Sequence, residues 1–294
     1  MTLILDKKTK KLVRKAQQDE INSHIIYGKL AATVKNPHNA EILGKISGEE
    51  LKHYEFWKSA SQQDIRPQKR RVWFFYLISR FLGITFGIRL MERGEHNAQI
   101  VYQQLRKVFP DIKTIIEDEE RHEDQLIDML DEDLLNYVGS IVLGLSDALV
   151  ELTGILAGFS LALQNTRLIA LAGFIAGVSA AFSMAASEYL SASEEEEMKS
   201  PLKASLYTGM SYLFTVIILI LPFFALEEEE PVIPLLISLI SAVLIILLFT
   251  FYISVAKNMS FRKRFLKITA ICLGVALFSL TLGIVARTFF HVEV

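Results

Sequence analysis

The segments Glu50-Leu-Lys-His53 and Glu119-Glu-Arg-His122 decide how the first half of this 294-residue chain is expected to fold. Each places a carboxylate and an imidazole three residues apart, and residues i and i+3 of an α-helix lie on one face. Each segment can therefore direct both groups at a single point. The two segments also repeat an arrangement, because each follows a helix-like stretch that carries glutamate and each lies after a proline, at Pro37 and Pro110.

Four helices are predicted in this half, from the helical spacing of apolar residues and from the proline breaks. They cover about residues 8–34, about residues 37–62, a stretch running through Glu92 and Glu95 to about residue 108, and about residues 111–132. The acids and imidazoles that these helices can bring together are the candidate metal ligands: Glu20, Glu50, His53, Glu92, Glu95, Glu119 and His122. Carboxylates with two imidazoles suit iron or manganese, and the lack of thiolates argues against a structural zinc site.

The composition divides the chain into a charged first half and an apolar second half. Hydrophobic residues make up 51% of the chain, which indicates a membrane part. The first 138 residues hold 22 of the 31 Lys and Arg residues and 21 of the 33 Asp and Glu residues. The net charge of −2 gives no reason to expect a nucleic-acid partner. The single cysteine, Cys272, excludes both a disulfide within the chain and a four-cysteine iron site.

Five apolar stretches follow, each long enough to cross a bilayer at about 20 residues per helix. They are roughly residues 139–163, 168–190, 202–226, 232–256 and 266–290. Lys and Arg cluster in the loops after the second and fourth stretches, and such loops tend to lie in the cytoplasm. We therefore expect a multi-pass protein of the cell (inner) membrane, with a cytoplasmic first half and with Val294 outside.

Polar residues inside these stretches are costly and need a reason. Asp147 and Glu151 lie one turn apart on the first, and Met184 and Glu188 lie one turn apart on the second. Carboxylates and a thioether form a mixed donor set that suits a divalent ion in transit. The alternative is that the acids are protonated and take part only in helix packing.

Residues about 8–133 resemble the erythrin, or rubrerythrin-like, branch of the ferritin-like superfamily, through the candidate ligands named above. Glu95, one turn after Glu92, makes the pattern similar to that of a rubrerythrin rather than a ferritin. The resemblance implies a four-helix bundle that holds two iron ions. Rubrerythrins usually carry a separate four-cysteine iron domain as well. This chain cannot form one, so we expect metal binding and single oxidation events without the electron supply that peroxidase turnover requires.

Residues 139–163 and 177–191 resemble the vacuolar iron transporter family. The resemblance implies that Asp147 and Met184 line an ion path, and that a homodimer exchanges Fe²⁺ for protons. Glu151 and Glu188 are added to the path from their helical spacing. Eukaryotic members hold a long glutamate-rich cytoplasmic segment between the second and third spans. Here only residues 191–203 connect these spans, with the acidic run Glu194–Glu197.

The whole chain thus resembles the fused erythrin and vacuolar iron transporter family, also called membrane-bound ferritin. We expect an all-α protein with a cytoplasmic ferritin-like domain at residues 1–135 and a five-helix membrane domain at residues 136–294. The expected function is export of Fe²⁺ by proton antiport, with iron captured, and in one version oxidised, in the first domain. The alternatives are a membrane-tethered di-iron peroxidase or oxidase and an exporter of manganese.

Residues 72–90, VWFFYLISRFLGITFGIRL, allow two interpretations. They could form a buried crossover that leads into the third helix. They could instead form an amphipathic segment on the membrane surface, with aromatic side chains at headgroup level and with Lys69, Arg70 and Arg71 near lipid phosphates.

Overall fold

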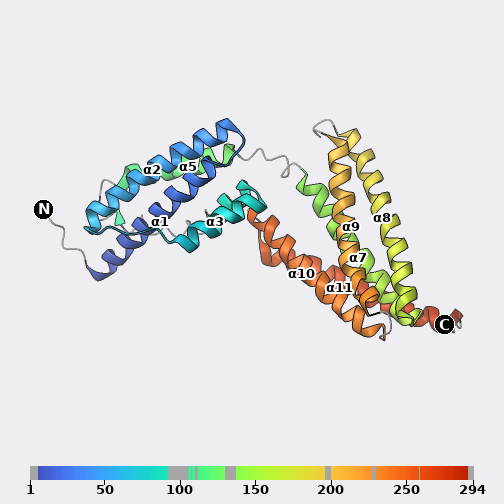
Figure 1. Cartoon of the computed structure of the whole chain (residues 1–294). Helices are drawn as coiled ribbons and strands as arrows, with labels where there is room; N and C mark the ends of the chain where they lie inside the picture. The colour runs from blue at the N-terminus through green and yellow to red at the C-terminus, as the bar shows by residue number, and fades with distance from the viewer. Residues whose placement is uncertain are drawn as a thin grey trace. The chain divides into compact units, whose positions relative to one another are not determined.

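The structure, a computed structural model, describes residues 6–91, 105–106, 108–109, 112–129, 137–195, 200–226, 230–257 and 259–290. The regular elements in these residues are helices, so the prediction of an all-α chain is confirmed. The chain forms two compact units, Met1–Glu132 and Asp133–Val294 (Figure 1). The sequence predicts a boundary between residues 135 and 136.

The first unit is built on long helices whose starts follow from local capping. Helix α1 (Lys7–Ala31) is capped by Asp6, whose carboxylate accepts a bond from the Thr9 N–H at 2.8 Å. Helix α2 (Pro37–Ser61) is capped by Asn36 and begins with Pro37, as the sequence predicts. Helix α1 packs against α2 and α3 (Lys69–Leu82), and α2 packs against α5 (Ile112–Asp128).

The apolar core of this unit has two clusters, and the candidate ligands fall between them along each helix. One cluster includes Ala16 of α1, Trp57 of α2 and Ile115 of α5, and the other includes Ile26, Ile46 and Leu126 of the same three helices. Glu20 lies between the two members on α1, Glu50 and His53 between those on α2, and Glu119 and His122 between those on α5. Apolar packing therefore flanks these polar side chains at both ends.

The two halves of the segment 69–91 have different surroundings. Helix α3 exposes apolar side chains, including Trp73 and Phe81, whereas residues 84–88 are buried. Gly83, with a φ of 96°, separates α3 from the helical residues 84–91. The interpretation of a buried crossover thus fits the second half of the segment, and an exposed amphipathic helix fits the first.

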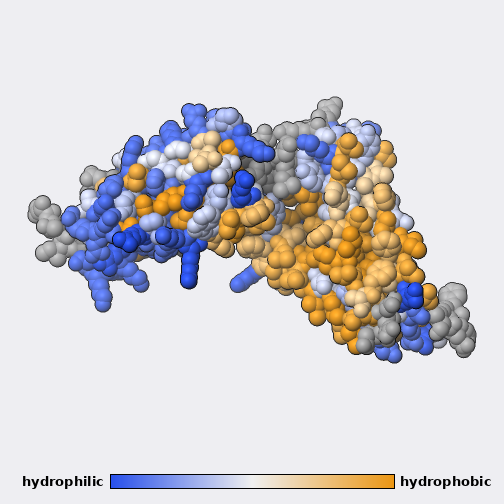
Figure 2. Space-filling view, in the orientation of Figure 1, coloured by the Kyte–Doolittle hydropathy of each residue, from blue (hydrophilic) through white to orange (hydrophobic). Residues whose placement is uncertain are grey.

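The second unit consists of α7 (Val138–Ala162), α8 (Thr166–Glu194), α9 (Pro201–Ala225), α10 (Val232–Ala256) and α11 (Phe261–Phe290). Within the described residues, these five helices are long and apolar enough to span a membrane, which confirms the five predicted stretches. The surface of this unit is largely hydrophobic, whereas the first unit is mostly hydrophilic (Figure 2). The chain is therefore a multi-pass membrane protein.

Helix α7 packs against each of the other four helices of this unit. It approaches α11 closely, because a Cβ atom added at Gly283 would overlap the carbonyl oxygen of Gly158. Small residues let helix backbones approach closely in a membrane, where packing rather than the hydrophobic effect drives association. The segment Gly154-x-x-x-Gly158 has this role here.

Candidate metal centre

Four side chains from three helices converge in the first unit. Glu20 of α1, Glu50 and His53 of α2, and Glu119 of α5 each offer a ligand atom, and these atoms lie within 4.8 Å of one another. The first three are buried and Glu119 is largely covered. His53 Nδ1 lies 3.4 Å from Glu119 Oε1 and 3.7 Å from Glu20 Oε2. This spacing suits a cation held by carboxylates and an imidazole.

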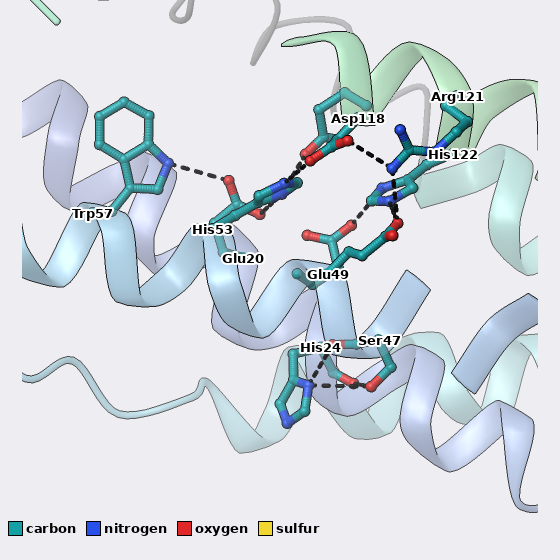
Figure 3. Close-up of polar contacts among 11 residues, drawn as sticks. Glu20, His24, Ser47, Glu49, His53, Trp57, Asp118, Arg121 and His122 are labelled. Atoms are coloured by element: carbon teal, nitrogen blue, oxygen red, sulfur yellow. Dashed lines mark hydrogen bonds and ion pairs between the residues drawn. The ribbon is translucent and has the colours of Figure 1, made fainter. Parts of the chain in front are cut away.

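His122 extends the cluster with a second imidazole. Its Nδ1 lies 3.4 Å from Glu50 Oε1, and its ring centroid lies 5.8 Å from that of His53. Each histidine therefore points Nδ1 at a carboxylate from a Glu-x-x-His segment of the other helix: His53 at Glu119, and His122 at Glu50. Five of the seven predicted ligands thus lie together. Figure 3 labels three of them, Glu20, His53 and His122. Glu92 and Glu95 lie outside the described residues.

The outer nitrogen of each imidazole contacts an acid that the sequence analysis did not select. His53 Nε2 lies 3.1 Å from Asp118 Oδ2, and His122 Nε2 lies 2.7 Å from Glu49 Oε2. The contacts cross between helices, since Asp118 of α5 holds His53 of α2 and Glu49 of α2 holds His122 of α5. A carboxylate that accepts the Nε2 proton fixes the tautomer and leaves the Nδ1 lone pair for a metal ion.

Arg121 joins the two outer acids. Its guanidinium donates to Asp118 Oδ1 at 2.6 Å and to Glu49 Oε2 at 3.1 Å. These bonds, together with the histidine contacts, outweigh burial and lower the pKa of both acids below their ordinary values. Both acids therefore stay ionised at neutral pH and can accept bonds from the histidine N–H groups. Figure 3 shows the contacts of Glu49 and Asp118 with the two histidines and Arg121.

Burial and neighbouring charges shift the pKa values of His53, Glu119 and His122 in different directions. Burial opposes a charge on His53, but Glu119 and Glu20 outweigh this effect and raise its pKa from 6.5 to about 10. Burial raises the pKa of Glu119 from 4.5 to about 7, against the influence of His53. Burial, with the charge on His53, lowers the pKa of His122. Without a bound cation, the cluster therefore retains protons at neutral pH.

A bound cation fits one further observation. The Nδ1 atoms of both His53 and His122 are buried and make no hydrogen bond within the described part of the chain. A buried polar atom that makes no hydrogen bond costs about 1–3 kcal/mol. A metal ion between Nδ1 and the facing carboxylates would satisfy both atoms, so the residues present fit a metal centre.

Glu20 is also held from the side opposite His53. The Trp57 indole N–H donates to Glu20 Oε1 at 3.2 Å, and Trp57 is fully buried. Glu20 Oε2 faces His53, so the two carboxylate oxygens have different partners. Trp57 thereby fixes the orientation of this carboxylate, which sequence reasoning did not foresee.

The candidate path residues lie in the second unit, and two of them have polar partners on other helices. Tyr212 of α9 donates to a carboxylate oxygen of Glu151 on α7, and Ser140 of α7 donates to Glu188 on α8. Met184 packs against the apolar core of the unit. In the described residues of this unit, no three acidic, His or Cys side chains approach one another as closely as those of the first unit.

Residues 138–200 match the VIT family. The match includes helices α7 and α8, the two helices that carry the motifs compared above with vacuolar iron transporters. It supports the resemblance to the VIT family in this part of the chain and points to membrane transport of a metal ion. No curated protein and no solved structure matched the chain.

Proposed function

We propose that this protein exports Fe²⁺ from the cytoplasm in exchange for protons, and that its first unit captures the ion. The observation that carries the proposal is a buried cluster of acids and imidazoles in a chain whose first two membrane helices match the VIT family. Neither feature alone would connect ion capture with ion movement.

The first unit is proposed to be a ferritin-like bundle with a di-iron centre. The residues that would hold the ions are Glu20, Glu50, His53, Glu119 and His122, with Glu92 and Glu95 completing the set. When bound, the two ions would supply redox chemistry between Fe²⁺ and Fe³⁺. The chain's own contribution is to orient the two imidazoles through Glu49 and Asp118, to hold Glu20 through Trp57, and to exclude water.

The second unit is proposed to provide the path. Glu188 and Met184 on α8 and Asp147 and Glu151 on α7 would accept the ion in turn, starting from the acidic run Glu194–Glu197. A carboxylate that binds either a proton or a metal ion couples the two, because protonation lowers metal affinity. Acids at membrane depth are costly, and a function in transport explains why they are present.

The orientation is proposed from the positive residues of the loops. The first unit and the loops after α8 and α10 would face the cytoplasm, and the C-terminus would face outward. The membrane is proposed to be the cell (inner) membrane, and the working form a homodimer.

The buried cluster also supports a second candidate function, a membrane-tethered di-iron peroxidase or oxidase in which α7–α11 serve only as an anchor. A third candidate is export of manganese, because the same donor set binds Mn²⁺. Ion transport by the purified protein would distinguish an exporter from an anchored peroxidase or oxidase. The identity of the transported ion would then distinguish Fe²⁺ export from Mn²⁺ export.

The experiment uses full-length protein in sealed vesicles with an imposed pH gradient and a fluorescent reporter of Fe²⁺. We expect Fe²⁺ movement that Asp147→Asn abolishes, whereas metal binding to the first unit, measured on the same variant, persists. Glu230→Gln, which changes an acid next to the start of α10, is the matched control and should transport normally. Wild-type vesicles that bind iron without moving it would overturn the proposal and favour the anchored enzyme.

A further inference from the structure

The exposed face of α3 is distinctive within the first unit. Six large apolar side chains are exposed in the described part of this unit, and five of them belong to α3. They are Trp73, Phe74, Leu77, Phe81 and Leu82. Phe81 is 80% exposed, Phe74 is 55% exposed and Trp73 is 50% exposed, so these side chains are not core residues of which only an edge reaches the surface. Contiguous apolar surface of this kind marks an interaction site.

Helix α3 packs on the core through its other side. Val72 and Ser79 are buried, and Phe75 and Tyr76 pack against the core cluster that includes Ile26 and Leu126. The exposed residues Trp73, Phe74, Leu77 and Phe81 follow the spacing i, i+1, i+4, i+8, which forms a second apolar stripe along the helix. From Trp73 to Phe81 the stripe covers about 12 Å along this 14-residue helix. The residues of this stripe are not part of the apolar core.

Positive charge surrounds the stripe, and negative charge is absent from the sequence around it. Residues 65–91 contain six Lys and Arg residues and no Asp or Glu. Arg70 and Arg80 are exposed and lie toward the two ends of the stripe, and Lys69 is exposed beside Arg70. On the neighbouring helix α1, Lys29 Nζ lies 4.8 Å from the centroid of the Trp73 ring. Aromatic side chains flanked by cations are typical of helices that lie in a membrane interface.

We infer that α3 docks the first unit on the surface of an anionic lipid bilayer. The stripe of Trp73, Phe74, Leu77 and Phe81 would enter the boundary between headgroups and acyl chains, and Lys69, Arg70 and Arg80 would contact phosphates. The chain itself favours lipid as the occupant, since five apolar helices fix it in a bilayer. A second copy of α3 is disfavoured, because its cations would face those of the first.

The chain offers an internal probe for this inference. Its two tryptophans, Trp57 and Trp73, both belong to the first unit, and none lies in the membrane helices. Trp57 is fully buried, and Trp73 is half exposed on the stripe. Quenching of tryptophan emission by brominated acyl chains therefore reports contact between the first unit and lipid. The difference between the wild-type chain and Trp73→Phe gives the signal of Trp73 alone.

The test reconstitutes full-length protein in nanodiscs with brominated phosphatidylcholine and phosphatidylglycerol. We expect Trp73 to lose most of its emission and Trp57, seen in Trp73→Phe, to retain its emission. Arg70→Glu/Arg80→Glu should relieve the quenching, because each basic residue contributes about fivefold to binding at an anionic surface. Lys45→Glu/Lys52→Glu reverses two exposed cations on α2 and should leave the quenching unchanged.

Two results would overturn the inference. Trp73 emission that brominated lipid leaves unchanged, while aqueous iodide quenches it, would show that the stripe faces water. Emission protected from both quenchers would assign the stripe to a protein partner, such as a second copy of the chain. Circular dichroism of each variant verifies that α3 and the rest of the chain remain folded. None of these outcomes depends on whether the protein transports iron.

Discussion

His122 Nε2 on α5 lies 2.7 Å from Glu49 Oε2 on α2, and this contact has a counterpart between His53 and Asp118 at 3.1 Å. In both cases the acid directly precedes the glutamate of a Glu-x-x-His segment and holds the histidine of the other segment. The arrangement gives each imidazole a fixed tautomer with Nδ1 turned inward.

Substitution of either outer acid should therefore weaken metal binding without removing a ligand. Glu49→Gln and Asp118→Asn should each lower the affinity of the full-length protein for Mn²⁺ or Fe²⁺ by about 10–100-fold, the usual effect of losing such a partner. Isothermal titration with Mn²⁺ under reducing conditions measures this change. Glu41→Gln and Asp124→Asn alter exposed acids on the same two helices and should bind as the wild type does.

Metal binding should release protons. In the metal-free cluster the pKa of His53 is about 10, so this imidazole is protonated at pH 7. An imidazole must be neutral to bind a metal ion, and the ion therefore displaces the proton. Addition of Mn²⁺ to full-length protein in weak buffer should acidify the solution. His53→Gln should release less acid, and equal release by the two proteins would refute the assignment of His53.

Without metal, the first unit should lose stability as the pH rises. The folded-state pKa of His53 lies above its ordinary value, so its contribution is complete below about pH 6.5 and disappears as the pH passes about 10. The pKa of Glu119 is raised to about 7, so its ionisation also costs stability between about pH 4.5 and pH 7. The lowered pKa values of Glu49 and Asp118 stabilise the folded state at neutral pH, and this contribution is lost only as the pH falls below about 4.5.

Limited proteolysis of chelator-treated protein at pH 6 and at pH 9 measures this effect in the full-length chain. We expect faster cleavage within residues 6–129 at pH 9, and protection at that pH when Mn²⁺ is added. Cleavage at equal rates at both pH values would contradict the raised pKa of His53.

Tyr212 should matter for transport if Glu151 lies on the path. The hydroxyl of Tyr212 on α9 donates to Glu151 on α7, and Tyr212→Phe removes this bond while keeping the ring. We expect slower Fe²⁺ movement in vesicles, by about 10-fold if the bond contributes about 1.4 kcal/mol. Tyr207→Phe, which retains the stacked ring against Tyr137, is the control. Normal transport by Tyr212→Phe would remove Glu151 from the path.

The contact between α7 and α11 should tolerate no added methyl group. Gly283→Ala places a carbon against the carbonyl of Gly158, and such overpacking costs about 1–3 kcal/mol. The midpoint of thermal unfolding in detergent should fall. Gly274→Ala on the same helix meets nothing within 4 Å and should leave the midpoint unchanged or raise it slightly.

The sequence predicted the parts of the site that depend on a single helix. Glu50 with His53, and Glu119 with His122, share a face because of their spacing, so their convergence followed from helical geometry. Glu49 and Asp118 could have been noticed, since an acid precedes the glutamate in both segments. Their partners, however, lie on another helix, and no periodicity within one helix specifies such a contact. The same holds for Trp57 with Glu20 and for Tyr212 with Glu151.

For helix α3, the sequence did not predict which face contacts the core. Its composition is apolar on nearly every side, and hydrophobicity alone does not say which face a helix turns to the core. Packing of Val72 and Ser79 against α1 and the segment 84–91 settles that choice and leaves Trp73 and Phe81 outside. The five membrane helices, in contrast, could be predicted from the sequence, because length and apolar composition are enough to identify a membrane-spanning helix.

The exchange of partners between α2 and α5 has a consequence for how the centre forms. The orientation of His53 is set from α5, and that of His122 is set from α2. A displacement of either helix would therefore disturb both imidazoles together, so the centre should form or be lost as a whole with the packing of α2 on α5.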